Sequence, residues 1–281
     1  MSLASLLNAE MCREFLKDFY LKQPFSQQGS CAAWKDAGNW ETVDGILQQA
    51  DADVLVVRQG QRWEEPRNPT PEEARQLFGD GYTVLVRHAE RHNPRLAALA
   101  DGFAAEFAAP VDVHVYCTPA SGFGFSWHYD AEDVFILQTQ GAKEYSLRKN
   151  TVNPWPLVET LPRDMRYERE IMPLMKCALQ AGDWLYIPNG YWHRADAQAD
   201  SISLAVGVLS TSALDVYDFL RLSLLDSLRW RQRLPPLGTL GEESETEEVC
   251  GNICADLADD LQRMLKNPKL IKQFVKAKLN K

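Results

Sequence analysis

Apolar and polar positions divide the chain into three parts with different periodicities. Up to about residue 110, helix-like spacing of Leu6, Leu7, Met11, Phe15 and Phe19 is followed by short strand-like runs at 54–58 and 82–86. From residue 111 to residue 210, short apolar runs separated by turn residues follow one another densely, which is typical of a β domain. After residue 210 helical spacing returns, on a stripe that contains Leu214, Tyr217, Leu220, Leu224 and Leu228.

The sequence therefore predicts a mainly β fold with flanking helices, divided into residues 1–110, 111–210 and 211–281. In the first part, prolines at the first turn begin two expected helices, at 71–78 and from residue 94 to about 107. The N-terminal part is expected to support the β core, and the C-terminal part to be a helical segment. A last amphipathic helix is expected to contain Leu257, Leu261, Met264 and Leu265.

Composition narrows the class of protein. A chain of 281 residues with 45% hydrophobic and 25% charged residues can bury a large core. Its net charge is 30 − 39 = −9, which argues against a general nucleic-acid-binding surface and would suit a basic partner. No stretch approaches the roughly 18 apolar residues of a membrane span, and the N-terminus lacks the basic flank and apolar core of a signal peptide. Six scattered cysteines without a CxxC pair indicate reduced thiols, so we expect a cytoplasmic protein.

One motif carries the strongest chemical signal. His128 and Asp130 form an H-x-D pair, and His193 follows after a turn, an apolar strand and a Pro-Asn-Gly turn. If the pair lies in a strand, both side chains point to the same face and can bind one metal ion. Two histidines and one carboxylate leave three positions of an octahedral metal open, as in non-haem Fe(II) oxygenases. By contrast, His88 and His92 lack the glutamate of HExxH, and a strand leads directly into them, so we interpret them as structural or surface residues.

With these residues in place, the chain resembles the cupin-fold, JmjC-type 2-oxoglutarate oxygenases, specifically the branch that hydroxylates ribosomal proteins. The sequence from Gly182 to His193, GDWLYIPNGYWH, is also similar to the segment around the distal histidine of the asparaginyl hydroxylase that modifies hypoxia-inducible factor. The resemblance covers roughly residues 10 to 210. It implies a double-stranded β-helix barrel that binds Fe(II) through His128, Asp130 and His193, with 2-oxoglutarate as cosubstrate.

The same resemblance assigns candidate cosubstrate-binding residues. Lys143, fifteen residues after His128, stands where the family has a Lys or Arg for the distal carboxylate of 2-oxoglutarate. Tyr116 stands where the ribosomal branch has a tyrosine that joins this cation, and Ser210 where some members have a serine. His114 replaces an asparagine common in the family and is included among the candidates, while Phe125 replaces a threonine of the asparaginyl hydroxylase.

Three functions remain open at this point. The leading one is hydroxylation of a protein or peptide side chain, with succinate and CO2 as coproducts and a ribosomal or other basic protein as a possible substrate. The second is the same chemistry on a free amino acid or another small molecule, and the third is a non-enzymatic cupin that binds a metal or ligand. The intact triad and Lys143 weigh against the third, because a binding module has no need for open metal positions.

Two further expectations concern surfaces. Trp127, Tyr129 and Arg194 alternate with the metal ligands, so they are expected either to contact substrate at the mouth of the barrel or to pack on its outer layer. The long insertion Asn150–Ile171 is the element expected to line or cover that mouth. The Leu214–Leu228 stripe either packs on its own barrel or pairs with a second subunit, and the family favours a homodimer.

Overall fold

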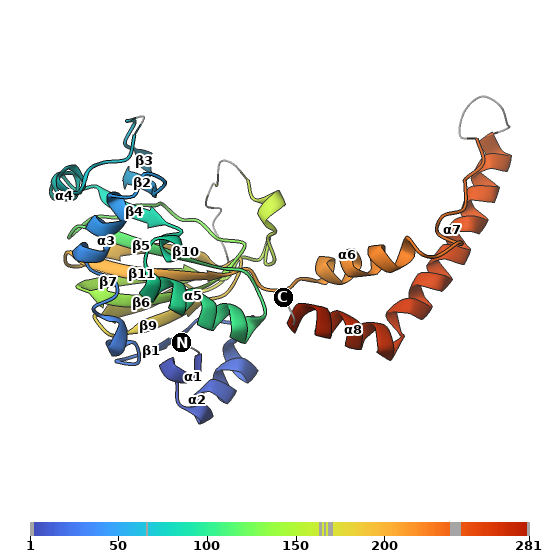
Figure 1. Cartoon of the computed structure of the whole chain (residues 1–281), viewed down its shortest axis with the longest axis horizontal. Helices are drawn as coiled ribbons and strands as arrows, with labels where there is room; N and C mark the ends of the chain where they lie inside the picture. Colours follow the sequence, from blue (N-terminus) through green and yellow to red (C-terminus); the bar gives the residue numbers. More distant parts are fainter. Residues whose placement is uncertain are drawn as a thin grey trace. The chain divides into compact units, whose positions relative to one another are not determined.

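The computed structural model describes residues 3–65, 67–162, 165, 167, 171–236 and 243–279. It divides into two compact units, Met1–Ser210 and Thr211–Lys281. Within these residues, the first unit contains all the strands, and the second consists of helices and their connections (Figure 1).

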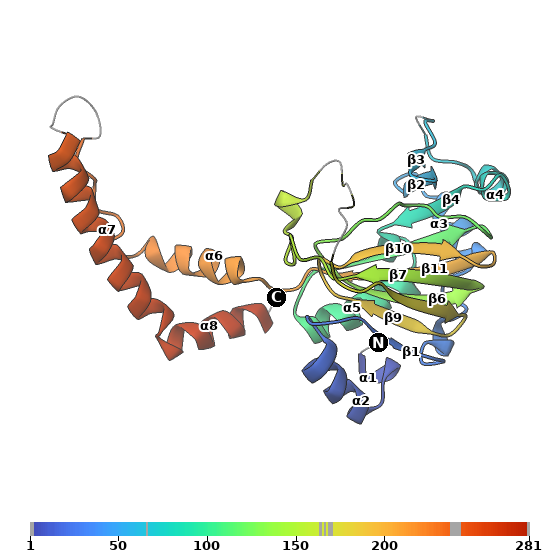
Figure 2. The ribbon, with the colours of Figure 1, turned by 180° about the vertical axis from the view of Figure 1, so that it is seen from behind.

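The first unit is built on a large and a small antiparallel sheet, seen from both sides in Figures 1 and 2. The large sheet has the order β1-β9-β6-β11-β5-β4-β2-β3. Its strands are β1 Phe25–Gln27, β2 Asp53–Arg58, β3 Gln61–Arg62, β4 Thr83–Arg87, β5 Val111–Thr118, β6 Asp133–Gln140, β9 Trp184–Ile187 and β11 Ser201–Val208. The small sheet has the order β10-β7-β8, with β7 Ala142–Arg148, β8 Met175–Gln180 and β10 Trp192–Ala197.

Helices cover the face of the large sheet that points away from the small sheet. They are α1 Leu3–Leu6, α2 Ala9–Glu14, a π-helical turn Phe15–Phe19, α3 Trp40–Leu47, α4 Pro71–Gly79 and α5 Pro94–Phe107. Alternation along the strands explains this arrangement: Phe135 and Leu137 of β6 pack in the cluster with Phe103 of α5. The opposite side chains, Val134 and Ile136, pack in a second cluster with residues of β7 and β8, so this cluster lies between the two sheets.

Most elements of the first unit match their sequence prediction. Strands β2 and β4 and helices α4 and α5 lie within a residue or two of the expected ranges. Helix α3 and strand β1 were not predicted, and the N-terminal helical region is interrupted once, at Leu7–Asn8, and continues from Phe15 as a π-helical turn. The expectation of a strand at His128–Asp130 is wrong: only His128 makes an isolated antiparallel bridge, to His193. Pro119, Gly122 and Gly124 favour turns in the loop that precedes this pair.

The second unit contains α6 Ala213–Leu224, α7 Glu243–Leu265 and α8 Pro268–Leu279. Helix α6 begins at a capping box between Ser212 and Asp215 and ends four residues before Leu228, so it is shorter than the apolar stripe. The stripe is divided: Leu220 and Leu224 are buried, whereas Leu214, Tyr217 and Leu228 are exposed. Within this unit, Lys278 of α8 donates to Asp215 of α6 at 2.6 Å. None of the described helices is both long and apolar enough to span a membrane.

Candidate functional site

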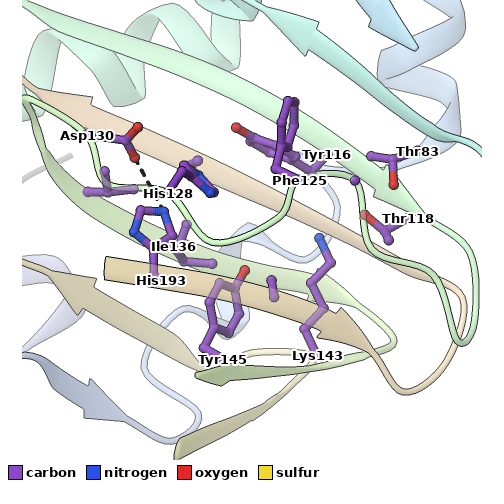
Figure 3. A pocket seen from close by; sticks show the side chains of 14 residues that line it. Thr83, Tyr116, Thr118, Phe125, His128, Asp130, Ile136, Lys143, Tyr145 and His193 are labelled. Carbon is purple, nitrogen blue, oxygen red and sulfur yellow. Dashed lines mark ion pairs between the residues drawn. The ribbon is translucent and has the colours of Figure 1, made fainter. Parts of the chain in front are cut away.

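The three predicted metal ligands lie together at one end of a pocket between the sheets (Figure 3). One ligand atom of each of His128, Asp130 and His193 lies within 4.8 Å of those of the other two. His193 Nε2 is 3.4 Å from Asp130 Oδ2, and the two imidazole ring centroids are 4.2 Å apart. Two side chains from one loop and one from β10 therefore converge on a volume that a single metal ion can occupy.

The backbone holds the two histidines in register. His128 N donates to His193 O at 3.1 Å, and His193 N donates to His128 O at 2.8 Å. Each ring also has a carbonyl partner: His128 Nδ1 lies 2.8 Å from Ser126 O, and His193 Nδ1 lies 3.0 Å from Tyr191 O. Because a carbonyl only accepts, Nδ1 carries the proton in both rings, and each Nε2 keeps a lone pair for a metal.

The protonation state of His193 also suits a ligand. Burial, followed by the neighbouring His128, lowers the pKa of His193 to about 4. A neutral imidazole at neutral pH is the form that binds a divalent metal.

The Pro-Asn-Gly turn before β10 fixes the loop that carries Asp130. Gly190 N donates to Asp130 O at 2.9 Å, and Asn189 Nδ2 donates to Ala131 O at 2.6 Å. Gly190 has φ +77°, and a Cβ there would lie 2.7 Å from Pro154 O, so only glycine fits. The turn thus connects the insertion, the Asp130 loop and the strand of His193.

Lys143 occupies the opposite end of the pocket, at its base. It lies on β7, is 3% exposed, and donates from Nζ to Ser203 Oγ at 2.9 Å. Among the described residues no carboxylate lies within ion-pair distance of its ammonium group. Burial without a counter-ion lowers the pKa of Lys143 to about 8. A buried ammonium group in such surroundings is chemically suited to bind an anion.

Tyr116 lies on the pocket wall between the two ends. The Lys143 ammonium group lies over its ring, 5.6 Å from the centroid. The tyrosine is partly buried, and the loss of solvent around its hydroxyl, followed by the nearby Asp130, raises the pKa of that hydroxyl. The structure therefore brings Tyr116 into the pocket, as expected, with its ring face toward Lys143.

The space of the pocket is about 570 Å³ when the open solvent at its mouth is included. Besides the residues above, its lining includes Thr83, Thr118, Gly124, Phe125 and Tyr145. Sequence reasoning did not single out Tyr145, Thr83, Thr118 or Ser203. For Ser203 a signal was present, because Ser201 and Ser203 alternate with Ile202 and Leu204 in a buried strand and so point to one face.

Two of the candidates from the resemblance need correction. Ser210 lies on the helix-covered side of the large sheet, where its Oγ donates to Asp133 Oδ2 at 2.6 Å and lies 2.8 Å from the Tyr20 hydroxyl. Its predicted contact with the cosubstrate is inconsistent with this position, because Asp133 alternates with the pocket-lining Val134. His114 faces Ala205 on β11 beside the metal end, and its Nδ1 accepts from His88 N at 3.1 Å. It does not line the base near Lys143.

The alternating aromatic side chains pack outward rather than into the pocket. Trp127 stacks on Tyr167 of the insertion at 4.7 Å, and Tyr129 meets Trp192 at 4.7 Å. Arg194 lies over the Phe123 ring and pairs with Asp196 at 2.6 Å. Of the two roles weighed for these residues, packing on the outer layer is the one observed.

The insertion Asn150–Ile171 does not line the pocket through any of its described residues; residues 163, 164, 166 and 168–170 lie outside them. Its Pro154 and Pro156 pack against the Gly190 turn, and Tyr167 packs against Trp127 and Trp192. The described part of the insertion therefore supports the metal end from outside.

A second group of potential ligands is satisfied internally. His88, Glu90 and Asp112 also have ligand atoms within 4.8 Å of one another. However, His88 Nδ1 lies 2.9 Å from Asp112 Oδ1, and Glu90 Oε2 accepts from Val113 N at 2.8 Å. His92 is not part of this group, so the structural interpretation of His88 and His92 fits their contacts.

Comparison with known proteins agrees with this geometry. Residues 86–216 match the JmjC domain family. The bifunctional lysine-specific demethylase and histidyl-hydroxylase NO66 of Dictyostelium discoideum is 34% identical over 135 residues, which cover 47% of this chain and 26% of that protein. Ribosomal oxygenase 1 of Gallus gallus is 25% identical over 249 residues, which cover 81% of this chain and 41% of the relative. The chain thus spans less than half the length of either relative.

Among solved structures, the chain is similar to YcfD, a ribosomal oxygenase from Escherichia coli, in complex with cobalt and 2-oxoglutarate. The TM-score is 0.62 at 20% sequence identity, and the alignment covers 97% of this chain and 71% of that one. At this identity the similarity establishes the fold, and the predicted double-stranded β-helix with a C-terminal helical segment is confirmed.

Proposed function

We propose, since residues 86–216 match the JmjC domain family, that the protein is a 2-oxoglutarate- and Fe(II)-dependent oxygenase that hydroxylates a polypeptide side chain. A single observation carries this proposal: a two-histidine, one-carboxylate group and a buried, anion-free lysine occupy opposite ends of one pocket.

The donor set fits an Fe(II) ion. His128 and His193 each offer Nε2, Asp130 offers a carboxylate oxygen, and backbone hydrogen bonds hold all three residues. The bound iron, with 2-oxoglutarate, would supply the oxidising chemistry, with succinate and CO2 as coproducts. Asp130 contributes a negative charge that partly offsets the divalent ion, and the set leaves three positions of an octahedral ion open. Other divalent ions fit the same donors, so iron is chosen by the chemistry it performs and by its availability.

Lys143 is proposed to bind the distal carboxylate of 2-oxoglutarate. Its ammonium group is a compact charge with three N–H donors. One of them donates to Ser203 Oγ, which leaves two donors for a ligand. Val134, Ile136 and Ala205 line the wall between the two ends. An apolar wall between a metal and a cation suits a short carbon chain with an acidic group at each end.

A direct experiment measures turnover of the cosubstrate. The purified protein, supplied with Fe(II) and 2-oxoglutarate, is expected to form succinate, and Asp130→Ala is expected to form none. Absence of succinate from the iron-loaded wild type, with or without a cell extract as substrate source, would leave only the non-enzymatic cupin.

A polypeptide substrate is proposed over a small molecule. In the described part of the chain no insertion residue lines the pocket, so nothing there closes it against a chain. The net charge of −9 suits a basic protein, and the resemblance to ribosomal oxygenases suggests a ribosomal one.

Mass spectrometry separates the two substrate classes. Two cell extracts, one depleted of proteins and one depleted of metabolites, are incubated with enzyme, Fe(II) and 2-oxoglutarate. We expect a peptide in the metabolite-depleted extract to gain the mass of one oxygen atom. A new oxidised metabolite without an oxidised peptide would favour the small-molecule alternative.

The C-terminal unit is proposed to support a homodimer of a cytoplasmic enzyme. Leu222, Leu225 and Leu228 are 60%, 56% and 78% exposed, an unusual density of large apolar side chains for a solvated surface. All six cysteines are free, which suits a reducing compartment. Light scattering during gel filtration measures the mass, and a monomer at micromolar concentration would contradict the dimer.

A further inference from the structure

The base of the pocket contains more hydrogen-bonding groups than the family resemblance assigns to it. Thr83 on β4 and Thr118 on β5 both line the pocket and are 1% and 4% exposed. Val84 pairs with Cys117, which places Thr83 directly opposite Thr118 in the sheet. Figure 3 shows both threonines beside the tip of Lys143. Two side-chain hydroxyls thus lie next to the buried ammonium group.

The hydroxyl groups of Thr83 and Thr118 form no hydrogen bonds with other described groups of the protein. Within the described residues, neither the Thr83 nor the Thr118 hydroxyl makes a hydrogen bond, whereas the neighbouring Ser201 Oγ donates to Thr118 O at 3.1 Å. Neither hydroxyl oxygen is among the described side-chain atoms that are buried without a hydrogen-bond partner, so both are open to the space of the pocket. The two threonines therefore have donors available to a ligand in the pocket.

Tyr116, by contrast, is poorly placed to bind a group held by Lys143. The Lys143 ammonium lies over the tyrosine ring rather than at its edge, where the hydroxyl is attached. Figure 3 shows the tyrosine oxygen directed away from Lys143 and toward the end with His128 and Asp130. The proximity of Asp130 and Glu132 to this hydroxyl agrees with that direction.

We infer that Thr83 and Thr118, rather than the Tyr116 hydroxyl, complete the carboxylate site of Lys143 and donate hydrogen bonds to the distal carboxylate of the cosubstrate. The inference rests on the proposed function, since it takes 2-oxoglutarate as the ligand. An ionised carboxylate accepts about four hydrogen bonds, so one ammonium and two hydroxyls leave it well satisfied at the closed end of the pocket. The Tyr116 hydroxyl is then left to the other end of the pocket, toward which it points, near His128 and Asp130.

The test compares hydroxyl deletions at the two positions. Thr118→Val and Thr83→Val preserve shape, and each is expected to weaken binding of 2-oxoglutarate to the Mn(II)-loaded protein by about ten- to a hundredfold, the range for one hydrogen bond to a charged group. Isothermal titration calorimetry measures this without turnover. Thr118→Ser keeps the hydroxyl and should restore most of the affinity. Tyr116→Phe should change it by less than about threefold.

Thr139→Val is the matched control. Thr139 is equally buried, at 2% exposure, but its hydroxyl donates to Ile202 O at 2.8 Å, so its loss should lower stability and leave binding unchanged. If the wild type binds 2-oxoglutarate and only Tyr116→Phe weakens it, the inference is wrong and the proposed function stands. If the wild type with intact Mn(II) binds no 2-oxoglutarate, the proposed function itself fails.

Discussion

The two ends of the pocket differ in how far their charged and polar groups are satisfied by other groups of the protein. At the metal end, His128, Asp130 and His193 contact one another, and both rings have backbone partners, so the groups are partly satisfied without an ion. At the base, Lys143 has one serine and a tyrosine ring around a full positive charge and no carboxylate among the described residues. The metal end is therefore preorganised at small cost, whereas the base is held in a state that an anion would relieve.

The largest expected effect comes from removing a metal ligand. His128→Ala or Asp130→Ala leaves two ligands, so we expect loss of stoichiometric metal and of succinate formation, while the fold persists through its backbone pairing. Metal content by mass spectrometry and far-ultraviolet circular dichroism check both statements. His92→Ala, at a histidine outside the pocket, is the control. A variant that keeps both metal and turnover would remove these residues from the site.

Replacing the buried cation tests the other end. Lys143→Ala should weaken 2-oxoglutarate binding by about 30- to several-thousand-fold, corresponding to roughly 2–5 kcal/mol for a desolvated charged contact, with metal content unchanged. Lys143→Arg should keep part of the affinity, because the guanidinium carries the charge but needs a wider pocket. An unchanged KM would transfer the role to another cation. Arg87 and Arg194 are weaker candidates, since they pair with Asp53 and Asp196.

The pH dependence should differ in sign between binding and stability. With its pKa lowered to about 8, Lys143 is charged below that pH, so 2-oxoglutarate affinity should fall as pH rises above about 8. Without ligand, the unfolded chain binds more protons than the folded one between about 8 and 10.5, so this group makes the folded state more stable as pH rises there.

Lys143→Met isolates that effect. Chemical unfolding of wild type and variant from pH 7 to pH 10.5, at constant salt, should show the difference in unfolding free energy shrinking by up to about 3 kcal/mol as pH rises. If the difference in unfolding free energy stays constant with pH, then Lys143 keeps an ordinary pKa. In that case, burying its charge at the base of the pocket costs less than described above.

The smallest expected effect is at the turn that supports the metal end. Gly190→Ala places a Cβ against Pro154 O in a backbone conformation with φ +77°, which should lower the free energy of unfolding by about 1–3 kcal/mol. We also expect metal affinity to fall several-fold through the Asp130 loop and 2-oxoglutarate affinity at saturating metal to change little. Gly45→Ala, inside α3 with open space around it, is the control.

The sequence predicted the metal end better than the base of the pocket. The residues of the metal end lie in short motifs, whereas most residues of the base come from strands that are distant in the sequence. His128, Asp130 and His193 belong to short motifs of chemically distinctive residues, and the turns and apolar strands around these motifs, together with the family resemblance, indicated a shared site. Ser203, Thr83 and Thr118 are ordinary strand residues that meet only through the register of β4, β5 and β11. Such pairing depends on three-dimensional topology, which the pattern of one strand does not contain.

The incorrect expectations have similar causes. Ser210 was selected by counting from His193, but alternation around the end of β11 turns it to the helix-covered side, where Asp133 binds it. Helix α3 was missed although Asn39 caps it, because eight residues give a short periodic pattern. The long apolar stripe after Ser210 suggested a longer helix than α6, because apolar residues continue past Leu224 where the backbone does not.

The antiparallel bridge between His128 and His193 has a consequence for how the chain acquires its metal. The two residues are 193 − 128 = 65 positions apart, and closing a loop of that length costs entropy that local contacts do not return. His193 is the second residue of β10, which pairs with β7. The three ligands therefore come together only when β10 lies beside the loop that carries His128 and Asp130. Until then the chain contains an H-x-D pair without its third ligand.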